Sequence, residues 1–238
     1  MKTVLLTGVS GGIGEAIAKK LLEQNYFVLG VSYTNRDFGK CLEESAPNFK
    51  SYQCDLSDFD AAQALLEQIH QDGYSLDYLI NNAGVSIVGL LQDLTRSDWE
   101  FLWNTNVTSA LALSRAAISD FLSKGSGKII NISSVWGNNG ASCEVAYSAT
   151  KGALNTFTKA LAKELAPSNI QVNALACGII DTKMNAHLSQ ADLDAIIDEI
   201  PAGRIGTPED IADAVSALLQ SGNYLTGQII SVDGGWTV

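Results

Sequence analysis

The fold is decided by the stretch TVLLTGVSGGIG, residues 3–14. Its apolar start, Thr3–Leu6, predicts a short buried strand, and the amphipathic segment Ile13–Gln24 predicts the helix that follows. Between them, three glycines form a G-x-x-x-G-x-G pattern. Glycines let the backbone turn tightly and approach a pyrophosphate, whose negative charge is favoured by the N-terminus of the following helix. The stretch therefore predicts a phosphate-binding strand–turn–helix unit; the alternative is a tight turn that only packs the helix on the strand.

The rest of the chain repeats this alternation of short apolar runs and longer amphipathic segments. We expect further strands at Phe27–Val31, Ser51–Asp55, Tyr78–Asn81, Lys128–Ser133, Ile170–Ala176 and Gln228–Val232. We expect further helices at Phe59–Gln71, Asp98–Leu122, Ala146–Leu165 and Pro208–Leu219. Such alternation is typical of βαβ units. The sequence therefore predicts an α/β fold: a Rossmann-type, doubly wound, seven-stranded parallel sheet with helices on both faces, which binds its ligands beyond the carboxyl ends of the strands.

Length and composition indicate one globular domain over residues 1–238. With 46% hydrophobic and 17% charged residues, the chain has enough apolar side chains for a full core, which excludes extensive disorder. The regular alternation is interrupted after the sixth predicted strand by a short helical stretch, Ala191–Ile200. We interpret residues 183–207 as a lid over a substrate site; the alternative is a surface helix and loop without a gating role.

Charge and cysteine content exclude several classes of partner. The chain has 15 Lys and Arg against 26 Asp and Glu, a net charge of −11, and no basic run, so we expect no nucleic-acid partner. No apolar stretch approaches the roughly 18 residues that span a bilayer, so we expect no membrane segment and a cytoplasmic location. The four cysteines include no CxxC pair and are accompanied by two histidines. We expect reduced thiols and no metal site.

A second motif, Tyr147-x-x-x-Lys151, indicates acid–base chemistry. At i,i+4 spacing the two side chains share one face of the predicted helix. A lysine ammonium favours the phenolate, so we expect it to lower the tyrosine pKa from about 10 toward the range useful for general acid–base catalysis. The alternative is a half-buried tyrosine beside a lysine that merely reaches solvent.

Together these motifs make the chain resemble the short-chain dehydrogenase/reductase family, nearly from end to end. The family's features occur in its order: Thr7-Gly8-x-x-x-Gly12-Ile13-Gly14, Asp55-Leu56, Asn81-Asn82-Ala83-Gly84, Asn106, Ser134, Tyr147-x-x-x-Lys151 and Gly178-Ile179-Ile180-x-Thr182. Their joint occurrence, with Ser134 thirteen residues before Tyr147, is highly specific.

The resemblance implies a catalytic role for four residues. Tyr147 would act as the general acid that protonates a carbonyl oxygen as hydride arrives, and Ser134 would hydrogen-bond that oxygen. Lys151 would contact the nicotinamide ribose and lower the tyrosine pKa, and Asn106 would hold a water that links Lys151 to solvent. Taken singly, Ser134 could be a turn former and Asn106 a polar helix residue.

The resemblance also implies a nicotinamide cofactor and the residues that bind it. These are Gly8, Ser10, Gly11, Gly12, Ile13, Gly14, Tyr33, Asp55, Leu56, Asn82, Ala83, Gly84, Tyr147, Lys151, Ile180 and Thr182. Asp55 would meet the adenine amino group, Asn82 the ribose region, and Ile180 and Thr182 the carboxamide. The alternative for Asp55 is a cap on the helix that starts near Ser57.

The end of the second strand favours NADP(H). NAD-specific members usually carry an acid there, whereas residues 31–36 contain none and end with Arg36. Two features oppose this interpretation: Asp37 follows Arg36, and Gly11 stands where many NADP-using relatives carry a basic residue. NAD stays open as the alternative.

Within the family the chain looks most similar to the 3-oxoacyl-[acyl-carrier-protein] reductases. This rests on its length and on the segments 104–106, 201–210 and 226–235. It implies reduction of 3-oxoacyl thioesters in fatty acid biosynthesis, with an acyl carrier protein as partner. Carrier reductases commonly dock that acidic partner through basic residues, where this chain has Ser168-Asn169 and Gly125, and its net charge opposes docking. The alternatives are a dehydrogenase or reductase of a small free ketone, alcohol or sugar, and a dinucleotide-binding sensor without turnover.

Several residues around the expected site depart from the family pattern or are candidates for pocket walls. Cys177 stands where the family usually has proline; we expect it to be a small buried hydrophobe, with a reactive thiol as the alternative. Trp136, Asn138 and His187 are candidates for shaping the substrate pocket. The resemblance further implies a homotetramer, formed through the helices Asp98–Leu122 and Ala146–Leu165.

Overall fold

A seven-stranded parallel sheet runs through the part of the chain that the computed structural model describes, residues 1–33 and 36–237 without the side chains of 36–38 and 40. Its strands are β1 (Thr3–Thr7), β2 (Phe27–Ser32), β3 (Phe49–Gln53), β4 (Tyr78–Asn81), β5 (Gly127–Ser134), β6 (Ile170–Cys177) and β7 (Ile229–Val232). They lie in the order β3-β2-β1-β4-β5-β6-β7, and every neighbouring pair is parallel. The predicted doubly wound sheet is confirmed.

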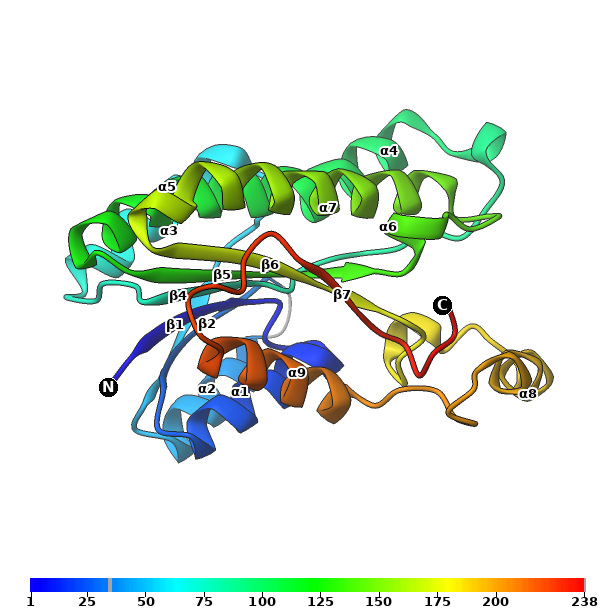
Figure 1. The fold of residues 1–238 in the computed structure, drawn as a ribbon, viewed down its shortest axis with the longest axis horizontal. Coiled ribbons are helices and arrows are strands. Elements are labelled where there is room, and N and C mark those ends of the chain that lie inside the picture. Colours follow the sequence, from blue (N-terminus) through cyan, green and yellow to red (C-terminus); the bar gives the residue numbers. More distant parts are fainter. Residues whose placement is uncertain (34–35, 238) are drawn as a thin grey trace.

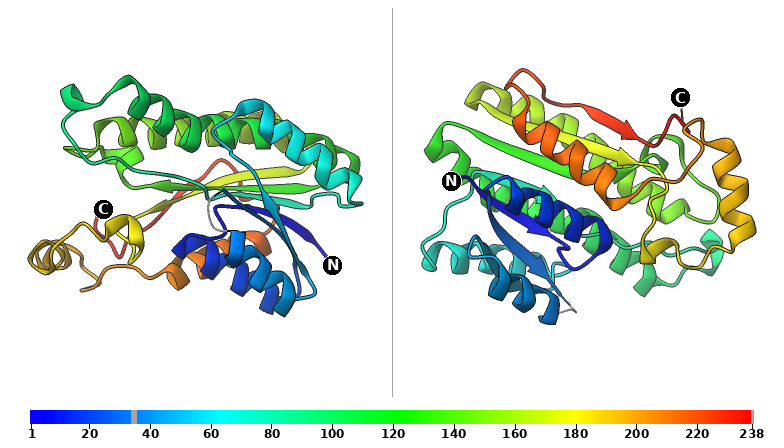
Figure 2. Two further views of the ribbon diagram at one scale, coloured as in Figure 1. Left: turned by 180° about the vertical axis from the view of Figure 1, so that it is seen from behind. Right: turned by 90° about the horizontal axis from the view of Figure 1, so that it is seen from below.

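Helices cover both faces of this sheet. They are α1 (Gly12–Glu23), α2 (Arg36–Ser45), α3 (Phe59–Gln71), α4 (Arg96–Trp103), α5 (Ser109–Lys124), α6 (Trp136–Asn139), α7 (Val145–Leu165), α8 (Gln190–Glu199) and α9 (Pro208–Gln220). Figures 1 and 2 show α1, α2 and α9 on one face and α3, α5 and α7 on the other. Each face has its own apolar core, one around Ile17, Leu6 and Val215, the other around Phe121 and Leu79. Burial of apolar side chains in both cores stabilises the sheet and thereby fixes the position of the carboxyl ends of its strands.

Two predicted elements differ from the structure by more than one residue at an end. The third strand begins two residues earlier than expected, because Phe49 is buried opposite Val28 and sets the register. The predicted helix Asp98–Leu122 is divided into α4 and α5 by a wider π turn over Asn104–Thr108. Turns of this kind are frequent at functional sites.

The segment 183–207 leaves the sheet after β6 and returns at α9. It contains the short helix η4 (Lys183–Asn185) and α8, which begins and ends one residue before the predicted Ala191–Ile200. Ile180 pairs with Gly206, so the two ends of the segment lie together. Figure 1 shows α8 beyond the end of the sheet at which β5 and β6 finish, where a lid would stand.

None of the helices in the described part of the chain is both long and apolar enough to cross a bilayer.

Candidate active site

The glycine turn after β1 is packed against the end of β4. Gly8 has φ +67°, and a side chain there would lie 2.9 Å from Nδ2 of Asn82 and 3.0 Å from Cα of Ala83. A side chain at Gly14 would overlap the carbonyl oxygen of Gly8. Asn82 fixes the turn, since its Nδ2 donates to the carbonyl oxygens of Thr7 (2.9 Å) and Gly8 (3.2 Å). Both glycines are therefore required by close packing.

The N-terminus of α1 has the form of an anion site. Gly11 is its N-cap and supplies no side-chain hydrogen bond, whereas α3, α4, α8 and α9 are each capped by a side chain. The first N–H groups of α1 therefore remain available beside Ser10, Gly12 and Ile13. A pyrophosphate is the group that such a glycine turn and helix end would hold. The residues present thus fit the dinucleotide that the sequence predicts.

The expected adenine end of the site is partly described. Asp55 is exposed, and its Oδ1 accepts hydrogen bonds from N (3.0 Å) and Oγ (2.7 Å) of Ser57, while Asp58 caps α3. Asp55 thus shapes the turn before α3, and its Oδ2 accepts no hydrogen bond from the described part of the chain. Leu56 is buried beneath it, and Tyr33 is 57% exposed at the end of β2. Residues 34–35 and the side chains of Arg36 and Asp37, on which the NADP prediction partly rests, lie outside the described residues.

Tyr147, Lys151 and Ser134 come together at the ends of β5 and β6. Tyr147 and Lys151 project from one face of α7 into the protein, and their exposed fractions are only 9% and 4%. Nζ of Lys151 lies 5.6 Å from the centroid of the Tyr147 ring and donates a 2.9 Å hydrogen bond to the carbonyl oxygen of Ile132. Ser134 ends β5 and lines the same two pockets as Tyr147. The predicted triad is therefore assembled.

Burial controls the titration of this group. It raises the pKa of Tyr147, as does the Glu144 carboxylate, while the neighbouring Ser134 side chain acts against the rise. Burial lowers the pKa of Lys151 to about 8. The expected lowering of the tyrosine pKa by Lys151 stays a prediction, since burial, the largest influence on Tyr147 in this structure, acts in the opposite direction.

Asn106 has a positioning role in the structure. Within the π turn, its Oδ1 accepts from the backbone N–H of Val85 (2.8 Å), and its Nδ2 donates to the Val85 carbonyl (2.8 Å) and to Oγ1 of Thr150 (3.1 Å). A side chain at Gly84 would lie 3.4 Å from both Oδ1 of Asn106 and Nζ of Lys151. Asn106 therefore ties the loop after β4 to α7, next to the lysine; its proposed water stays a prediction.

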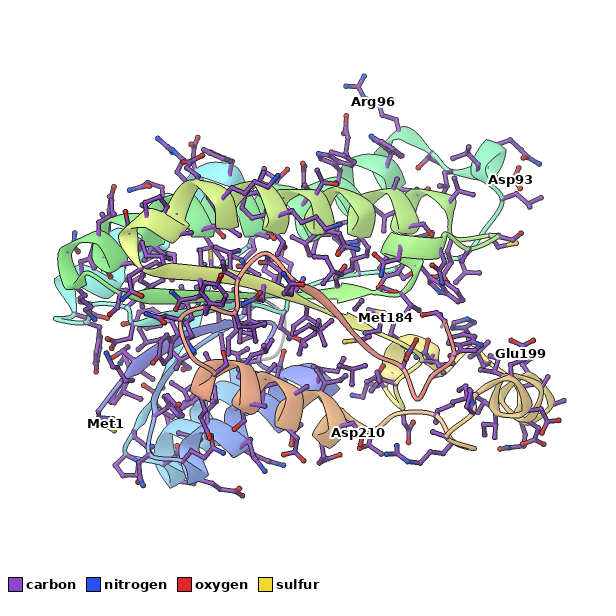
Figure 3. All side chains as sticks on the ribbon, viewed as in Figure 1. Met1, Asp93, Arg96, Met184, Glu199 and Asp210 are labelled. Carbon is purple, nitrogen blue, oxygen red and sulfur yellow. The ribbon has the colours of Figure 1, made fainter. Side chains whose placement is uncertain are left out.

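Two adjoining pockets meet at Tyr147. The smaller, of about 90 Å³, is lined by Ile13, Asn82, Gly84, Ile132, Ser133, Ser134, Tyr147, Lys151, Cys177, Gly178, Ile180, Thr182, Met184 and Asn185. The larger, of about 390 Å³, is lined by Ser86, Val88, Ser134, Val135, Trp136, Glu144, Tyr147, Gly178, Ile179, Met184, Asn185, His187, Leu188, Ile196 and Trp236. Figure 3 shows Met184 at the end of the sheet that faces α8. The first pocket contains the predicted cofactor residues Asn82, Ile180 and Thr182, and the second reaches toward the segment 183–207.

The walls of the larger pocket agree only in part with the sequence predictions. Trp136 and His187 line it as expected, and Trp136 packs edge-on against Trp236 at 5.0 Å. Asn138 does not line it, because its Oδ1 accepts a 2.9 Å hydrogen bond from Asn155 on α7. Sequence reasoning missed Glu144, although its place three residues before Tyr147 was a usable signal.

Cys177 behaves as the predicted small buried side chain. It is 5% exposed, lines the smaller pocket, and burial raises its pKa to about 12. A thiol with so high a pKa stays protonated and is a poor nucleophile.

Comparison with known proteins identifies the family. The sequence model described as short chain dehydrogenase matches residues 2–193. An uncharacterized oxidoreductase of Bacillus subtilis is 42% identical over 99% of this chain and 98% of its own length. The 3-oxoacyl-[acyl-carrier-protein] reductase of Aquifex aeolicus is 36% identical over 98% of this chain and 96% of its own.

Similarity in structure points the same way. A crystal structure from Agrobacterium tumefaciens, provisionally described as a gluconate dehydrogenase, superposes with a TM-score of 0.92 and 28% identity, over 99% of this chain and 96% of that one. The glycine turn, the buried tyrosine–lysine pair and these matches lead to one conclusion. The chain belongs to the short-chain dehydrogenase family and is a short-chain oxidoreductase.

Proposed function

We propose that the chain is a nicotinamide-dependent carbonyl reductase with Tyr147 as its general acid. The observation that carries this is the position of Tyr147 and Ser134, which line both pockets and so stand where a cofactor and a substrate would meet. A bound reduced nicotinamide supplies a hydride to the carbonyl carbon. The Tyr147 hydroxyl gives its proton to the carbonyl oxygen, and Ser134 holds that oxygen by a hydrogen bond.

The remaining residues orient the reacting groups. Lys151, held by the Ile132 carbonyl, contacts the ribose next to Tyr147. Asn106 keeps the loop after β4 against α7, which places Gly84 beside the lysine. Cofactor binding is assigned to the glycine turn, Asp55-Leu56, Asn82-Ala83-Gly84, Ile180 and Thr182. The uncapped start of α1 and the Asn82 clamp support this assignment.

NADP(H) is the favoured cofactor. The described end of β2 presents Ser32 and the exposed Tyr33, with no carboxylate to bind a ribose 2′-hydroxyl. NAD(H) is the alternative, and its use at equal efficiency would overturn this assignment.

A 3-oxoacyl thioester is the first candidate substrate. Its support is the similarity to reductases named for that substrate and the mostly apolar wall of the larger pocket. An acyl chain is neutral and apolar, so such a wall suits it.

A small free carbonyl compound is the second candidate. It is favoured because the basic residues near β5 are already hydrogen-bonded within the protein. Nζ of Lys128 donates to the carbonyl oxygens of Leu218, Leu219 and Ser221 at the end of α9. Nζ of Lys124 donates to the Ser75 carbonyl and pairs with Asp77. Both cations thus serve the fold, and neither is free to dock an acidic carrier protein.

A homotetramer and a cytoplasmic location complete the proposal. Trp99 and Phe101 on α4, and Val145 at the start of α7, are exposed apolar side chains near the helices expected to pair. The four cysteines are free thiols, which is typical of proteins in a reducing compartment such as the cytoplasm.

The substrate proposal is tested by following oxidation of NADPH and NADH with acetoacetyl thioesters and a panel of free ketones. Turnover of the thioester with NADPH supports the first candidate. Turnover of free ketones alone supports the second, and absence of any turnover would contradict the proposed reaction.

A further inference from the structure

Glu144 places a carboxylate in the wall of the larger pocket. The residue stands at the N-cap of α7, but its side chain makes no capping hydrogen bond. Instead, its Oε1 accepts a 2.6 Å hydrogen bond from Oγ of Ser86, across the pocket mouth from α7. The carboxylate is therefore directed away from the helix that it precedes and toward the space that a substrate would fill.

No cationic side chain balances this carboxylate within the pocket. The wall contains neither Lys nor Arg, since Lys151 lines only the smaller pocket, and the Nδ1 atom of the wall's histidine, His187, is hydrogen-bonded to the Met184 carbonyl at 3.1 Å. Oε1 of Glu144 is held by Ser86, while Oε2 has no hydrogen-bond partner among the described residues. A half-buried carboxylate in an apolar wall is stabilised most by a cationic donor, because such hydrogen bonds are about twice as strong as neutral ones.

The neighbouring lid has the same sign of charge. α8 contributes Ile196 to the pocket and has four acids, Asp192, Asp194, Asp198 and Glu199, with no Lys or Arg. Glu199 accepts a 3.1 Å hydrogen bond from Nε1 of the pocket residue Trp236. Figure 3 shows Glu199 on α8, at the lid end of the molecule. The acids of α8 therefore favour cations over anions on this side of the pocket.

We propose that Glu144 is a specificity-determining residue that selects carbonyl substrates carrying a protonated amine over substrates carrying a carboxylate. This rests on the second candidate of the proposed function, reduction of a small free carbonyl compound, and names the class of that compound. The ammonium binds Oε2, while Ser86 fixes the carboxylate so that the carbonyl lies between Ser134 and Tyr147. Carboxylates are excluded because they would meet Glu144 without a cation to screen it.

The test compares three methyl ketones of equal chain length that end in an amine, a hydroxyl or a carboxylate. For the wild-type protein we expect kcat/KM to fall in that order. Glu144→Gln, which keeps a hydrogen-bond acceptor for Ser86, should lower kcat/KM for the amino ketone about tenfold or more. It should leave the hydroxy ketone nearly unchanged and raise kcat/KM for the keto acid. Glu67→Gln removes the same charge from the exposed side of α3 and should change none of the three.

A binding measurement separates this inference from the proposed reaction. A simple alkylamine should bind the cofactor-loaded wild-type protein and lose that binding in Glu144→Gln, whether or not any ketone is reduced. Amine binding that depends on Glu144 without turnover would retain the inference about the pocket and contradict the proposed reaction. Reduction of the three ketones without a preference for the amine, or amine binding unaffected by Glu144→Gln, would overturn the inference and leave the reaction standing.

Discussion

The ammonium of Lys151 lies 5.6 Å from the centre of the Tyr147 ring, and both groups are almost completely buried. Burial lowers the pKa of Lys151 to about 8 and raises that of Tyr147 above its usual value. At neutral pH the tyrosine is thus a proton donor and the lysine a cation beside it. This is the protonation state that reduction of a carbonyl requires, since the product oxygen takes up a proton.

The raised pKa of Tyr147 predicts how the reverse reaction depends on pH. Alcohol oxidation needs the phenolate, so its rate should increase as the pH rises toward the tyrosine pKa. The groups that face Tyr147 are Glu144, Cys177, Lys151 and Ser134. Because the Glu144 carboxylate raises the tyrosine pKa, Glu144→Gln should make the rate of alcohol oxidation rise at a lower pH than in the wild-type protein. The pH dependence of the oxidation rate, measured with an alcohol substrate for both proteins, checks this shift. A rise at higher pH in Glu144→Gln would contradict the prediction.

The packing of the glycine turn predicts that a side chain is tolerated at Gly11 but not at Gly14. A side chain at Gly14 would overlap the Gly8 carbonyl, whereas one at Gly11 would lie 3.5 Å from the same atom, an ordinary contact. Gly14→Ala should therefore lose about 1–3 kcal/mol of unfolding free energy and weaken cofactor binding. Gly11→Ala is the matched control and should leave the unfolding free energy unchanged. Urea unfolding measures the free energy of unfolding of both variants, and cofactor titration measures the affinity of Gly14→Ala. An equal loss of unfolding free energy in the two variants would refute the packing argument.

The open space at Gly11 also predicts a change of cofactor preference. Gly11 is exposed at the start of α1, so Gly11→Arg should fold normally and place a cation beside the expected adenosine ribose. We expect the ratio of kcat/KM for NADPH to that for NADH to increase about tenfold, because a guanidinium binds a 2′-phosphate bidentately. The ratio is measured with one substrate at saturation, and an unchanged ratio would place the phosphate elsewhere.

A salt bridge between the segment 183–207 and α9 predicts a pH-dependent stability. Arg204 donates to both carboxylate oxygens of Asp210 at 2.6 and 2.8 Å, and Thr207 adds a backbone donor, so the pKa of Asp210 is held well below its usual range. A depressed carboxyl pKa contributes stability that is present above its unfolded pKa of about 4 and is lost as the pH falls.

The matching variant is Asp210→Ala, which also removes the capping box of α9. We expect it to lose about 1 kcal/mol of unfolding free energy at pH 7, mostly from the cap, because the pair is partly exposed. The difference from wild type should shrink below about pH 4. Denaturant unfolding of both proteins at pH 7 and below about pH 4 measures this difference in unfolding free energy. A difference that grows in acid would contradict the assignment.

Local sequence patterns predicted the sheet and the catalytic helix because those features are set by periodicity. The strands β1 and β4 are mostly apolar runs buried on both faces, and the i,i+4 spacing of Tyr147 and Lys151 fixes their shared face on α7. The start of β3 was misplaced because it depends on the packing of Phe49, which is a tertiary contact.

Other features depend on contacts between distant segments and could not be inferred from one chain. The π turn at Asn106 is set by bonds to Val85 and Thr150, which lie on other elements. The upward shift of the Tyr147 pKa follows from burial that only the assembled pocket creates. The role of Glu144 needs its hydrogen bond to Ser86, 58 residues away in the chain.

The most direct measurement is NADPH oxidation by Tyr147→Phe compared with the wild-type protein, together with NADPH affinity by fluorescence titration. The variant loses only the hydroxyl that is proposed to donate the proton. We predict a fall in kcat of about 100-fold or more, with cofactor affinity nearly unchanged. A variant that reduces its substrate at the wild-type rate would contradict the assignment of Tyr147 as the general acid.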